Sequence, residues 1–329
     1  MKKVFGVLGG GSWGTALVKI LSENCEKINW YVRNQENVDY INKFKCNPNY
    51  LSSISLRMNK INVCSSIQDV TKKSDILVLA IPSPFLNSEI KKIENMILDK
   101  YVFSALKGVV PDSHLVVSEH LNQNYGVPLS NIGIITGPCH AEEVALEKLS
   151  YLTVANQDAQ IGQFVKKSLQ TKFINSKLSN DNFGVEYAAM LKNIYALVAG
   201  ISNGLGYGDN FQSVLISNSV QEMKKFIKKI YKVKRNINGS EYLGDLLVTS
   251  YSSFSRNRTL GNMIGRGYSI NSAISEMNMI SEGYYATKNA YEIGLDNKTK
   301  FKIIETAYEI LYKGKSPKKC LKDLSEKLN

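Results

Sequence analysis

The 329-residue chain has few cysteines and no C-x-x-C pair, and the five that it has are scattered along the sequence. This spacing excludes a disulfide framework and a cysteine-based zinc site, and it favours a reducing compartment. We expect no secretory signal, because Lys2 and Lys3 lead directly into the first predicted strand. The longest apolar run, residues 188–201, is interrupted by Lys192 and Asn193 and is too short to span a bilayer. We therefore expect a cytoplasmic protein that has neither a metal centre nor stable membrane insertion.

Acidic residues are outnumbered, because 41 Lys and Arg stand against 29 Asp and Glu, which gives a net charge of +12. The sequence contains no basic stripe with interleaved aromatic residues and no nucleic-acid-binding motif, so we expect no nucleic-acid partner. The predicted helix over residues 222–235 has an apolar face that includes Phe226, and a lysine-rich opposite face. We interpret the lysine face as a solvated surface; contact with an acidic lipid or a partner is the alternative.

The first eighteen residues contain the order of elements that a dinucleotide site needs. An apolar run over residues 4–8 predicts a buried strand, and residues 15–18 continue at helical spacing. Between them, Gly9, Gly11 and Gly14 form a G-x-G-x-x-G pattern. Gly9 permits a tight turn, Gly11 lets a pyrophosphate approach the backbone, and Gly14 lets the helix pack close to the strand. The free N–H groups at the start of the helix favour an anion.

Further buried strands alternate with helices up to about residue 180, and this pattern predicts a Rossmann-type, doubly wound α/β sheet. The expected strands are residues 28–32, 61–64, 76–81, 102–106, 132–136, 149–155 and 172–174. From Val185 onward the periodicity is helical. We therefore expect a dinucleotide-binding domain over residues 1–183 and an all-helical, substrate-binding domain over residues 184–329. The glycine-rich residues 200–210 predict a tight loop within the second domain.

Three charged residues and one polar segment stand where a ligand would need them. Arg33 follows the second strand, where a NAD-selective site would place an acidic residue; a cation there favours the 2′-phosphate of NADP. Lys107 follows a strand end and is placed to meet an anion. Lys192 stands in an apolar helix, and partial desolvation would lower its pKa toward a range useful for proton transfer. The segment Ser255–Arg258 offers many donors to a phosphate.

These motifs together resemble the soluble, bacterial NAD(P)-dependent glycerol-3-phosphate dehydrogenase family, nearly from end to end. The resemblance is carried by residues 9–17, 105–108, 137–138, 191–193, 204–210, 244–246, 255–258 and 281–283. It implies reduction of dihydroxyacetone phosphate to sn-glycerol 3-phosphate with NADPH or NADH, for glycerophospholipid synthesis. The hydride would come from the nicotinamide and the proton from Lys192. No metal is needed for this reaction, and a homodimer is a possible assembly.

The resemblance also implies a role for each matching residue. The catalytic residues would be Lys192, Lys107 and Asp245. The cofactor would contact Gly9, Gly11, Ser12, Trp13, Gly14, Arg33, Lys107, Ala141, Arg256, Ile280 and Glu282. The substrate would contact Lys107, Gly137, Cys139, Lys192, Asp245, Ser255, Arg256 and Asn257. We expect the side chains at 107, 192 and 256 to converge on one small phosphorylated ketone.

Two positions depart from the family pattern. Cys139 stands where the family usually has a small hydroxyl residue, and a thiol is a weaker hydrogen-bond donor. His140 beside it is a rival proton donor, because an unperturbed histidine titrates near neutral pH. Two alternative functions remain open from the residues. One is a two-domain NADP-dependent reductase of another small keto or hydroxy acid, and the other is a non-catalytic NADPH-binding sensor.

Overall fold

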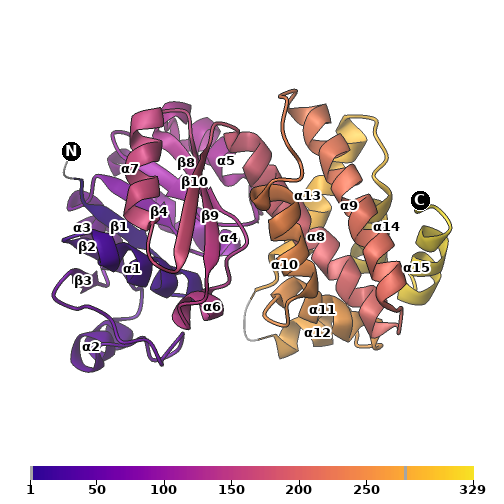
Figure 1. The fold of residues 1–329 in the computed structure, drawn as a ribbon, viewed down its shortest axis with the longest axis horizontal. Helices are drawn as coiled ribbons and strands as arrows, with labels where there is room; N and C mark the ends of the chain where they lie inside the picture. The colour runs from indigo at the N-terminus through magenta and orange to yellow at the C-terminus, as the bar shows by residue number, and fades with distance from the viewer. Residues whose placement is uncertain (1–2, 278–279) are drawn as a thin grey trace. The chain divides into compact units, whose positions relative to one another are not determined.

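The structure, a computed structural model, describes residues 3–277 and 280–329. The chain forms two compact units, which are shown as ribbons in Figure 1. The first comprises residues 1–106 and 117–182, and the second comprises residues 107–116 and 183–329. The sequence assigned residues 107–116 to the first domain, whereas the structure groups them with the helical unit. Each unit is described by itself below.

The first unit contains an eight-stranded sheet in the order β10-β9-β8-β5-β4-β1-β2-β3. The strands are β1 (Phe5–Leu8), β2 (Ile28–Tyr31), β3 (Ile61–Cys64), β4 (Ile76–Leu79), β5 (Tyr101–Ser104), β8 (Ile132–Thr136), β9 (Ser150–Asn156) and β10 (Ile174–Ser179). All neighbouring strands run parallel except β8 and β9. The strand order reverses at β1, between β2 and β4, and this switch point is where doubly wound sheets bind nucleotides. The predicted Rossmann-type sheet is confirmed.

Helices cover both faces of this sheet, as Figure 1 shows. They are α1 (Ser12–Asn24), α2 (Gln35–Phe44), α3 (Ile67–Lys72), α4 (Ser83–Ile90), α5 (Val117–Tyr125), α6 (Ala141–Ala145) and α7 (Ala159–Leu169), with the 3-10 turns η1 (Lys91–Met96) and η2 (Leu129–Asn131). Because both faces are covered, the central strands β1, β2, β4 and β8 are buried along their whole length. Their sequences are accordingly mostly apolar, and this is why the strands could be predicted.

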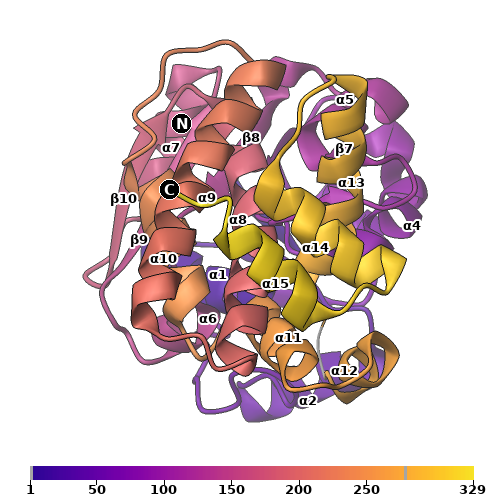
Figure 2. The ribbon, with the colours of Figure 1, turned by 90° about the vertical axis from the view of Figure 1, so that its right-hand side faces the viewer.

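In its described residues, the second unit is helical apart from a short hairpin of β6 (Val109–Val110) and β7 (Leu115–Val116). Its helices are α8 (Asn182–Gly204), α9 (Asp209–Ile230), α10 (Asp245–Tyr251), α11 (Arg256–Gly265), α12 (Ile270–Glu276), α13 (Glu282–Asp296), α14 (Lys302–Lys313) and α15 (Pro317–Ser325), with the π-helical turn η3 (Ser240–Gly244). Helix α14 packs against α13, α15 and α9, and Figure 2 shows α13, α14 and α15 as the orange-to-yellow series.

Helix α8 is the core of this unit, because residues 185–201 are almost wholly buried. The predicted loop over residues 200–210 is wrong in its first half. Helix α8 continues through Gly200 to Gly204, and α9 begins at Asp209. The two glycines lie in helix because α11 packs directly on them: a Cβ at Gly200 would lie 2.1 Å from the carbonyl oxygen of Arg258.

Candidate active site

The glycine turn at the end of β1 is held by contacts that fix its shape. Gly9 has a φ of +131°, which favours glycine, and its carbonyl accepts a hydrogen bond from the indole N–H of Trp30 at 2.9 Å. The Asn47 amide donates to the carbonyl of Gly10 at 3.0 Å and to the Thr15 hydroxyl at 2.9 Å. A Cβ at Gly14 would lie 2.1 Å from the Gly9 carbonyl oxygen, so α1 can approach β1 this closely only with glycine there.

The start of α1 has the free donors that a pyrophosphate needs. No side chain of the described residues caps its N-terminus, and its first turn contains no acidic residue. The indole N–H of Trp13 is buried and has no hydrogen-bond partner among the described residues. A Cβ at Gly11 would meet nothing within 4 Å, so the backbone there faces open space. These features fit a bound nucleotide, whose phosphates accept hydrogen bonds from a helix N-terminus.

The other predicted ligand contacts of the first unit lie at strand ends. Arg33 is exposed just beyond β2, and Asn34 beside it caps α2 by accepting a hydrogen bond from the Asn37 N–H at 3.1 Å. Gly137 follows β8 with a φ of +124°, and a Cβ there would lie 2.6 Å from the Tyr151 carbonyl oxygen. Glycine is therefore required at 137.

Cys139 and His140 follow Gly137 and lead into α6. The Cys139 thiol is buried, at 7% exposure, and His140 is the N-cap residue of α6 without a capping hydrogen bond from its side chain. Ala141, the first residue of α6, is also 7% exposed. This loop thus presents a compact, mostly buried turn at the carboxyl end of β8, which is the edge of the sheet where ligands bind in such folds.

The second unit brings two lysine side chains together around one carboxylate. Asp245, the first residue of α10, is 1% exposed, and its Oδ1 accepts a hydrogen bond from the Nζ of Lys192 on α8. The Lys107 Nζ lies 3.3 Å from Oδ2 of the same carboxylate and 3.4 Å from Oδ1. Lys192 is 3% exposed, whereas the Lys107 side chain keeps 22% of its surface open to solvent. Two ammonium groups therefore share one buried carboxylate.

The electrostatics of this cluster follow from burial and from the excess of positive charge. Burial lowers the pKa of Lys192 well below its usual range; Asp245 opposes this effect and the second cation, Lys107, adds to it. Burial alone would raise the pKa of Asp245, but the two lysines outweigh that effect and hold this pKa below its ordinary value. Lys192 therefore gives up its proton more readily than an exposed lysine does.

A chain of amide hydrogen bonds links the lysine cluster to α11 and α13. The Asn193 amide donates to the carbonyl oxygen of Lys107, and its own Oδ1 accepts from the Asn257 amide at 2.9 Å. The Asn257 Oδ1 then accepts from the Ser281 hydroxyl at 2.7 Å and from the Gly283 N–H at 2.8 Å. Three helices and the segment before β6 are thereby held in one arrangement.

Close packing of backbones brings these helices together. A Cβ at Gly261 of α11 would lie 2.0 Å from the carbonyl oxygen of Leu197 on α8. A Cβ at Gly283 of α13 would lie 2.6 Å from the Asn193 carbonyl oxygen. Because no side chain separates the helices at these points, residues 192–193, 256–257 and 282–283 lie near one another within the unit.

The hairpin of β6 and β7 is tied to the helical unit at both ends, and this tether positions Lys107. Asn193 holds the carbonyl of Lys107 at its start, and the Asn289 amide of α13 donates to the carbonyl of His114 near its turn. The His114 ring also lies 3.6 Å from the Glu292 carboxylate. Lys107 therefore belongs structurally with Lys192 and Asp245.

The predicted phosphate-binding segment caps helix α11. The Ser255 hydroxyl accepts a hydrogen bond from the Arg258 N–H at 3.3 Å, and the Ser255 carbonyl accepts one from the Thr259 hydroxyl at 3.1 Å. The guanidinium of Arg256 donates to the carbonyl oxygen of Ile280 at 3.1 Å, which places Arg256 beside the start of α13, where Glu282 is the first residue.

Three supporting residues were not singled out from the sequence. Trp30 and Asn47 hold the glycine turn, as described above. Thr249 donates its hydroxyl to the Asp245 carbonyl at 2.6 Å and so stiffens the first turn of α10. Asn47 lies in a polar stretch that had no periodicity, and the indole of Trp30 is on an otherwise ordinary strand, so neither carried a signal. Both donate to backbone carbonyls of the glycine turn, which a sequence does not identify as partners.

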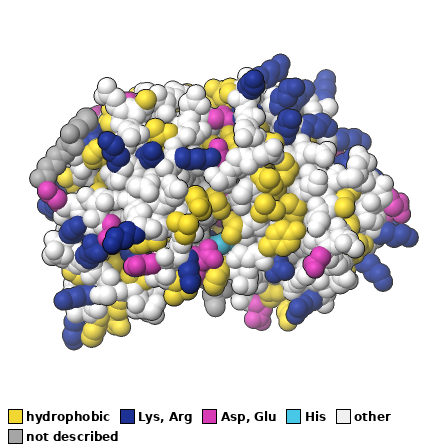
Figure 3. Space-filling view, in the orientation of Figure 1, with side chains coloured by type: hydrophobic (Ala, Val, Ile, Leu, Met, Phe, Trp, Pro, Cys, Tyr) yellow, Lys and Arg dark blue, Asp and Glu magenta, His cyan; other side chains and the backbone are white. Residues whose placement is uncertain are grey.

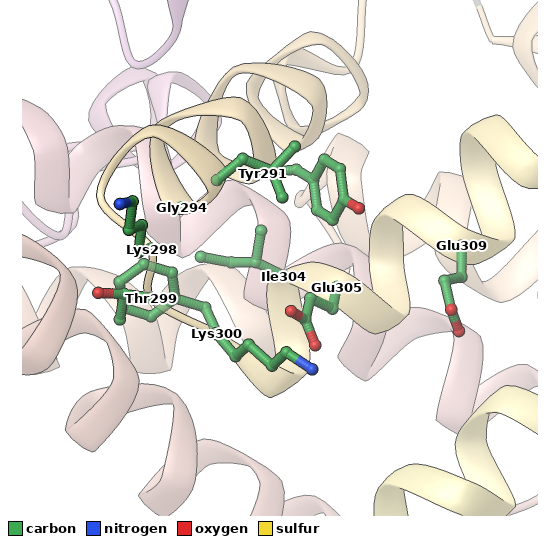
Figure 4. A pocket seen from close by; sticks show the side chains of 10 residues that line it. Tyr291, Gly294, Lys298, Thr299, Lys300, Ile304, Glu305 and Glu309 are labelled. Atoms are coloured by element: carbon green, nitrogen blue, oxygen red, sulfur yellow. The ribbon is translucent and has the colours of Figure 1, made fainter.

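A surface pocket of about 450 Å³ lies elsewhere in the helical unit, where α13 ends and α14 begins. Figure 4 shows Lys298, Thr299 and Lys300 on one side of it and Glu305 and Glu309 on α14. It contains none of the predicted site residues. The converging charges around Asp245 are the stronger indication of chemistry, because buried and mutually perturbed ionisable groups cluster at functional sites.

Both halves of the chain match family models. Residues 4–162 match the model described as NAD-dependent glycerol-3-phosphate dehydrogenase N-terminus, and residues 181–322 match the corresponding C-terminus. A relative from Bacillus pumilus called glycerol-3-phosphate dehydrogenase [NAD(P)+] is 33% identical over 319 residues, covering 96% of this chain and 91% of the relative. A relative of the same name from Staphylococcus aureus is 32% identical over 326 residues, covering 98% of this chain and 97% of the relative.

Solved structures share the fold. A glycerol-3-phosphate dehydrogenase from Coxiella burnetii superposes with a TM-score of 0.91 at 24% identity and covers 98% of both chains. A D-mandelate dehydrogenase reaches a TM-score of only 0.60 at 15% identity, covering 99% of this chain and 100% of that one. The match to both family models and the curated relatives confirm the resemblance seen in the motifs, and the alternative of another keto or hydroxy acid reductase is not favoured. The chain belongs to the NAD-dependent glycerol-3-phosphate dehydrogenase family.

Proposed function

We propose that this chain reduces dihydroxyacetone phosphate to sn-glycerol 3-phosphate with NADPH or NADH, and that Lys192, Lys107 and Asp245 form its catalytic centre. The observation that carries the proposal is the pair of ammonium groups around the buried Asp245 carboxylate. A ketone oxygen gains negative charge as hydride arrives, and preorganised cations stabilise that charge best where water is excluded.

Lys192 is the proposed general acid, because its burial lowers its pKa and so makes proton donation easier. Asp245 is the proposed partner that keeps Lys192 in place and favours its charged form. Lys107 is less buried and supplies a second positive charge to the developing alkoxide. His140, the N-cap residue of α6 in the first unit, is the rival donor, and the lowered pKa of Lys192 is the reason why we prefer Lys192.

The substrate phosphate is assigned to the start of α11. Arg256 would bind it through its guanidinium and Asn257 through its second amide hydrogen, because its first one bonds to Asn193. The free N–H groups of the first turn and the Ser255 hydroxyl would add donors. We assign Gly137 and Cys139 to the remaining substrate contacts. The Cys139 thiol would hydrogen-bond more weakly than the hydroxyl of the family pattern.

The first unit would hold the cofactor. The pyrophosphate would lie against Gly9, Gly11 and Gly14 and the N–H groups of Ser12 and Trp13. The uncapped helix, the open space at Gly11 and the unpartnered Trp13 indole support this assignment. When bound, NAD(P)H supplies the hydride.

The remaining cofactor contacts lie nearer its two ends. Arg33 would pair with a 2′-phosphate, which favours NADPH. Ala141, Arg256, Ile280 and Glu282 are assigned to the cofactor by the family pattern.

A cytoplasmic location and a homodimer complete the proposal. None of the five cysteines, all of which lie within the described residues, forms a disulfide, as a reducing compartment favours. Helix α10 exposes 38% of Leu247 and 49% of Tyr251, and Phe254 just beyond it is 47% exposed, which supports a contact between two copies. Light scattering of the purified chain tests this assembly, and a monomer at micromolar concentration would contradict it. No helix within residues 3–277 and 280–329 is both long enough and apolar enough to cross a bilayer.

The deciding experiment is NAD(P)H oxidation driven by dihydroxyacetone phosphate, run with each cofactor and with a panel of keto acids. We expect turnover with dihydroxyacetone phosphate at least a hundredfold above that with any keto acid without phosphate. Equal turnover with a keto acid would overturn the substrate assignment. Tight NADPH binding without turnover on any substrate would instead indicate a nucleotide sensor.

A further inference from the structure

The positive charge of the chain is concentrated in one short segment. Residues 224–235 contain six lysines and one arginine and no acidic residue, so they account for seven of the twelve net positive charges. The other 317 residues contain 34 basic and 29 acidic residues and carry only +5. A charge acquired only for solubility would be spread over the surface, and this one is not.

The fold places the four lysines of α9 on one side of the helix, and Lys232 and Lys234 follow just beyond its end. Met223, Phe226 and Ile227 of α9 are fully buried, and this fixes the rotation of the helix. The lysines on the opposite side of α9 and those just after it are all exposed. We call them the basic surface, and they are Lys224, Lys225, Lys228, Lys229, Lys232 and Lys234. Figure 3 shows dark blue side chains gathered over the region where α9 ends.

The positive charge of the basic surface is little neutralised by neighbouring carboxylates of the described residues. Among the residues that the structure describes, none places a carboxylate within 4.0 Å of Lys224, Lys228, Lys229, Lys232 or Lys234. Lysines spaced by four residues along α9, such as Lys224 and Lys228, repel each other. Favourable interaction with the negative end of the helix explains only Lys228 and Lys229 in its last turn. Lys232 and Lys234 lie beyond the helix and need another explanation.

Two apolar side chains are exposed between the lysines where α9 ends. Tyr231 is 38% exposed and Val233 is 42% exposed, and they alternate with Lys232 and Lys234. The chain becomes buried again only at Ile237. An aromatic and an aliphatic side chain between lysines is the composition that binds at the headgroup level of a bilayer.

We propose that residues 224–235 form a reversible docking surface for a bilayer that contains anionic lipid. Clusters of four to eight cations beside an amphipathic helix attract such bilayers. Tyr231 and Val233 would enter the headgroup region, and the lysines would lie over lipid phosphates.

The side chains favour a lipid over a nucleic acid. Lysine acts as a point charge, which suits a fluid array of headgroups, whereas sequence and backbone recognition of nucleic acids relies strongly on the planar fork of arginine. The only arginine of the segment, Arg235, directs its guanidinium to the carbonyl oxygen of Tyr231 at 3.3 Å. The surface also extends toward the loop before α14, because the Lys225 Nζ donates to the carbonyl oxygen of Lys300 at 3.1 Å.

The test is sedimentation of the full chain with vesicles of phosphatidylcholine alone and with vesicles in which one third of the lipid is phosphatidylglycerol. One variant combines Lys228→Gln, Lys229→Gln, Lys232→Gln and Lys234→Gln. Its matched control combines Lys318→Gln, Lys319→Gln, Lys322→Gln and Lys327→Gln. The control removes the same charge from exposed lysines of the α15 region, where Asp323 and Glu326 are interleaved. Both variants should oxidise NADPH with dihydroxyacetone phosphate as the parent chain does, which shows that they fold.

We expect the parent chain to bind the phosphatidylglycerol vesicles and not the pure phosphatidylcholine vesicles, and to dissociate as salt is raised. Each lysine near an anionic surface is worth roughly fivefold in binding, so the first variant should lose on the order of several hundredfold. The control should lose less than about fivefold, because its lysines would not approach the membrane. A third variant, Tyr231→Ser with Val233→Ser, should lose part of the binding at unchanged charge.

Three results would overturn the proposal. The first is no binding to phosphatidylglycerol vesicles even at low salt. The second is an equal loss in the two lysine variants, which would mean that net charge alone matters. The third is binding of duplex DNA that is tighter than vesicle binding and is lost in the first variant, which would reassign the surface to nucleic acid.

Discussion

Glu222 gives a prediction whose size can be worked from the structure. This side chain of α9 is 9% exposed, and its two oxygens accept hydrogen bonds from the N–H groups of Ile303 at 2.9 Å and Ile304 at 3.1 Å, in the first turn of α14. Burial raises the pKa of Glu222 from 4.5 to about 7; the two hydrogen bonds and Lys225 lower it, and Glu305 raises it. The carboxyl of Glu222 therefore titrates near neutral pH while it joins two helices.

The direction of the pH dependence follows from this raised pKa. Between pH 4.5 and about 7 the unfolded chain has lost this proton, whereas the folded chain still holds it. Protons then favour the folded state, and the free energy of unfolding falls as pH rises through this window. A tenfold change in proton affinity is worth about 1.4 kcal/mol, so the contribution of this one carboxyl falls by about 3 kcal/mol in total.

The perturbation is Glu222→Gln, which keeps the shape and an accepting oxygen but cannot titrate. Between pH 5 and pH 8, we expect the free energy of unfolding of the parent chain to fall by about 3 kcal/mol more than that of the variant. Urea unfolding followed by circular dichroism at several pH values measures it. Glu326→Gln, which removes an exposed carboxyl on the same unit, is the control and should parallel the parent chain. Parallel profiles for Glu222→Gln and the parent chain would refute the reasoning.

Three further predictions concern the two candidate sites. Lys192→Met should lower turnover by on the order of a hundredfold to ten-thousandfold while the NADPH dissociation constant stays within about twofold, because general acids contribute that much and the glycine turn is untouched; near-normal turnover in steady-state assays would remove Lys192 from its role. Gly11→Ala should leave the melting temperature unchanged and weaken NADPH binding, since its Cβ meets no protein atom, whereas Gly14→Ala should destabilise the fold by about 1–3 kcal/mol, since its Cβ would overlap a carbonyl oxygen. Thermal unfolding and NADPH fluorescence separate these two effects, and a matching loss of stability in both variants would contradict them. Arg33→Glu should shift the ratio of NADPH to NADH affinity by roughly tenfold or more toward NADH, because a charge-assisted hydrogen bond is worth about 1.5–3 kcal/mol; an unchanged ratio would show that Arg33 does not contact the 2′-phosphate.

The strands of the sheet could be predicted because burial on both faces leaves a continuous apolar run in the sequence. The expected strands at residues 61–64 and 132–136 coincide with β3 and β8, and most others differ from the structure by one or two residues at either end. The β6–β7 hairpin escaped prediction because its strands have two residues each, too few to produce a periodic pattern. Its tether to Asn193 and Asn289 is a long-range contact that no local pattern contains.

The residues of the candidate site could be predicted from the sequence to different degrees. The glycine pattern and the lysine in an apolar helix signal their chemistry locally, so Gly9, Gly11 and Lys192 could be proposed from the residues. The pairing of Lys192 and Lys107 with Asp245 spans 53 and 138 residues of sequence and came only from the family resemblance. The sequence also suggested a loop at Gly200, since glycine usually ends a helix. In the structure, Gly200 lies within α8, and the absence of a side chain there lets α11 pack directly against it.

The direct contact of α8 with α11 has a consequence for substrate length. The two backbones touch at Gly200 and Gly261 without an intervening layer of side chains, so neither helix can shift without displacing the other. One helix carries the proposed proton donor and the other begins with the proposed phosphate ligands. The distance between the proposed proton donor and the proposed phosphate ligands is then fixed by main-chain atoms. A phosphorylated ketone that is one carbon longer or shorter would therefore not reach both groups at once.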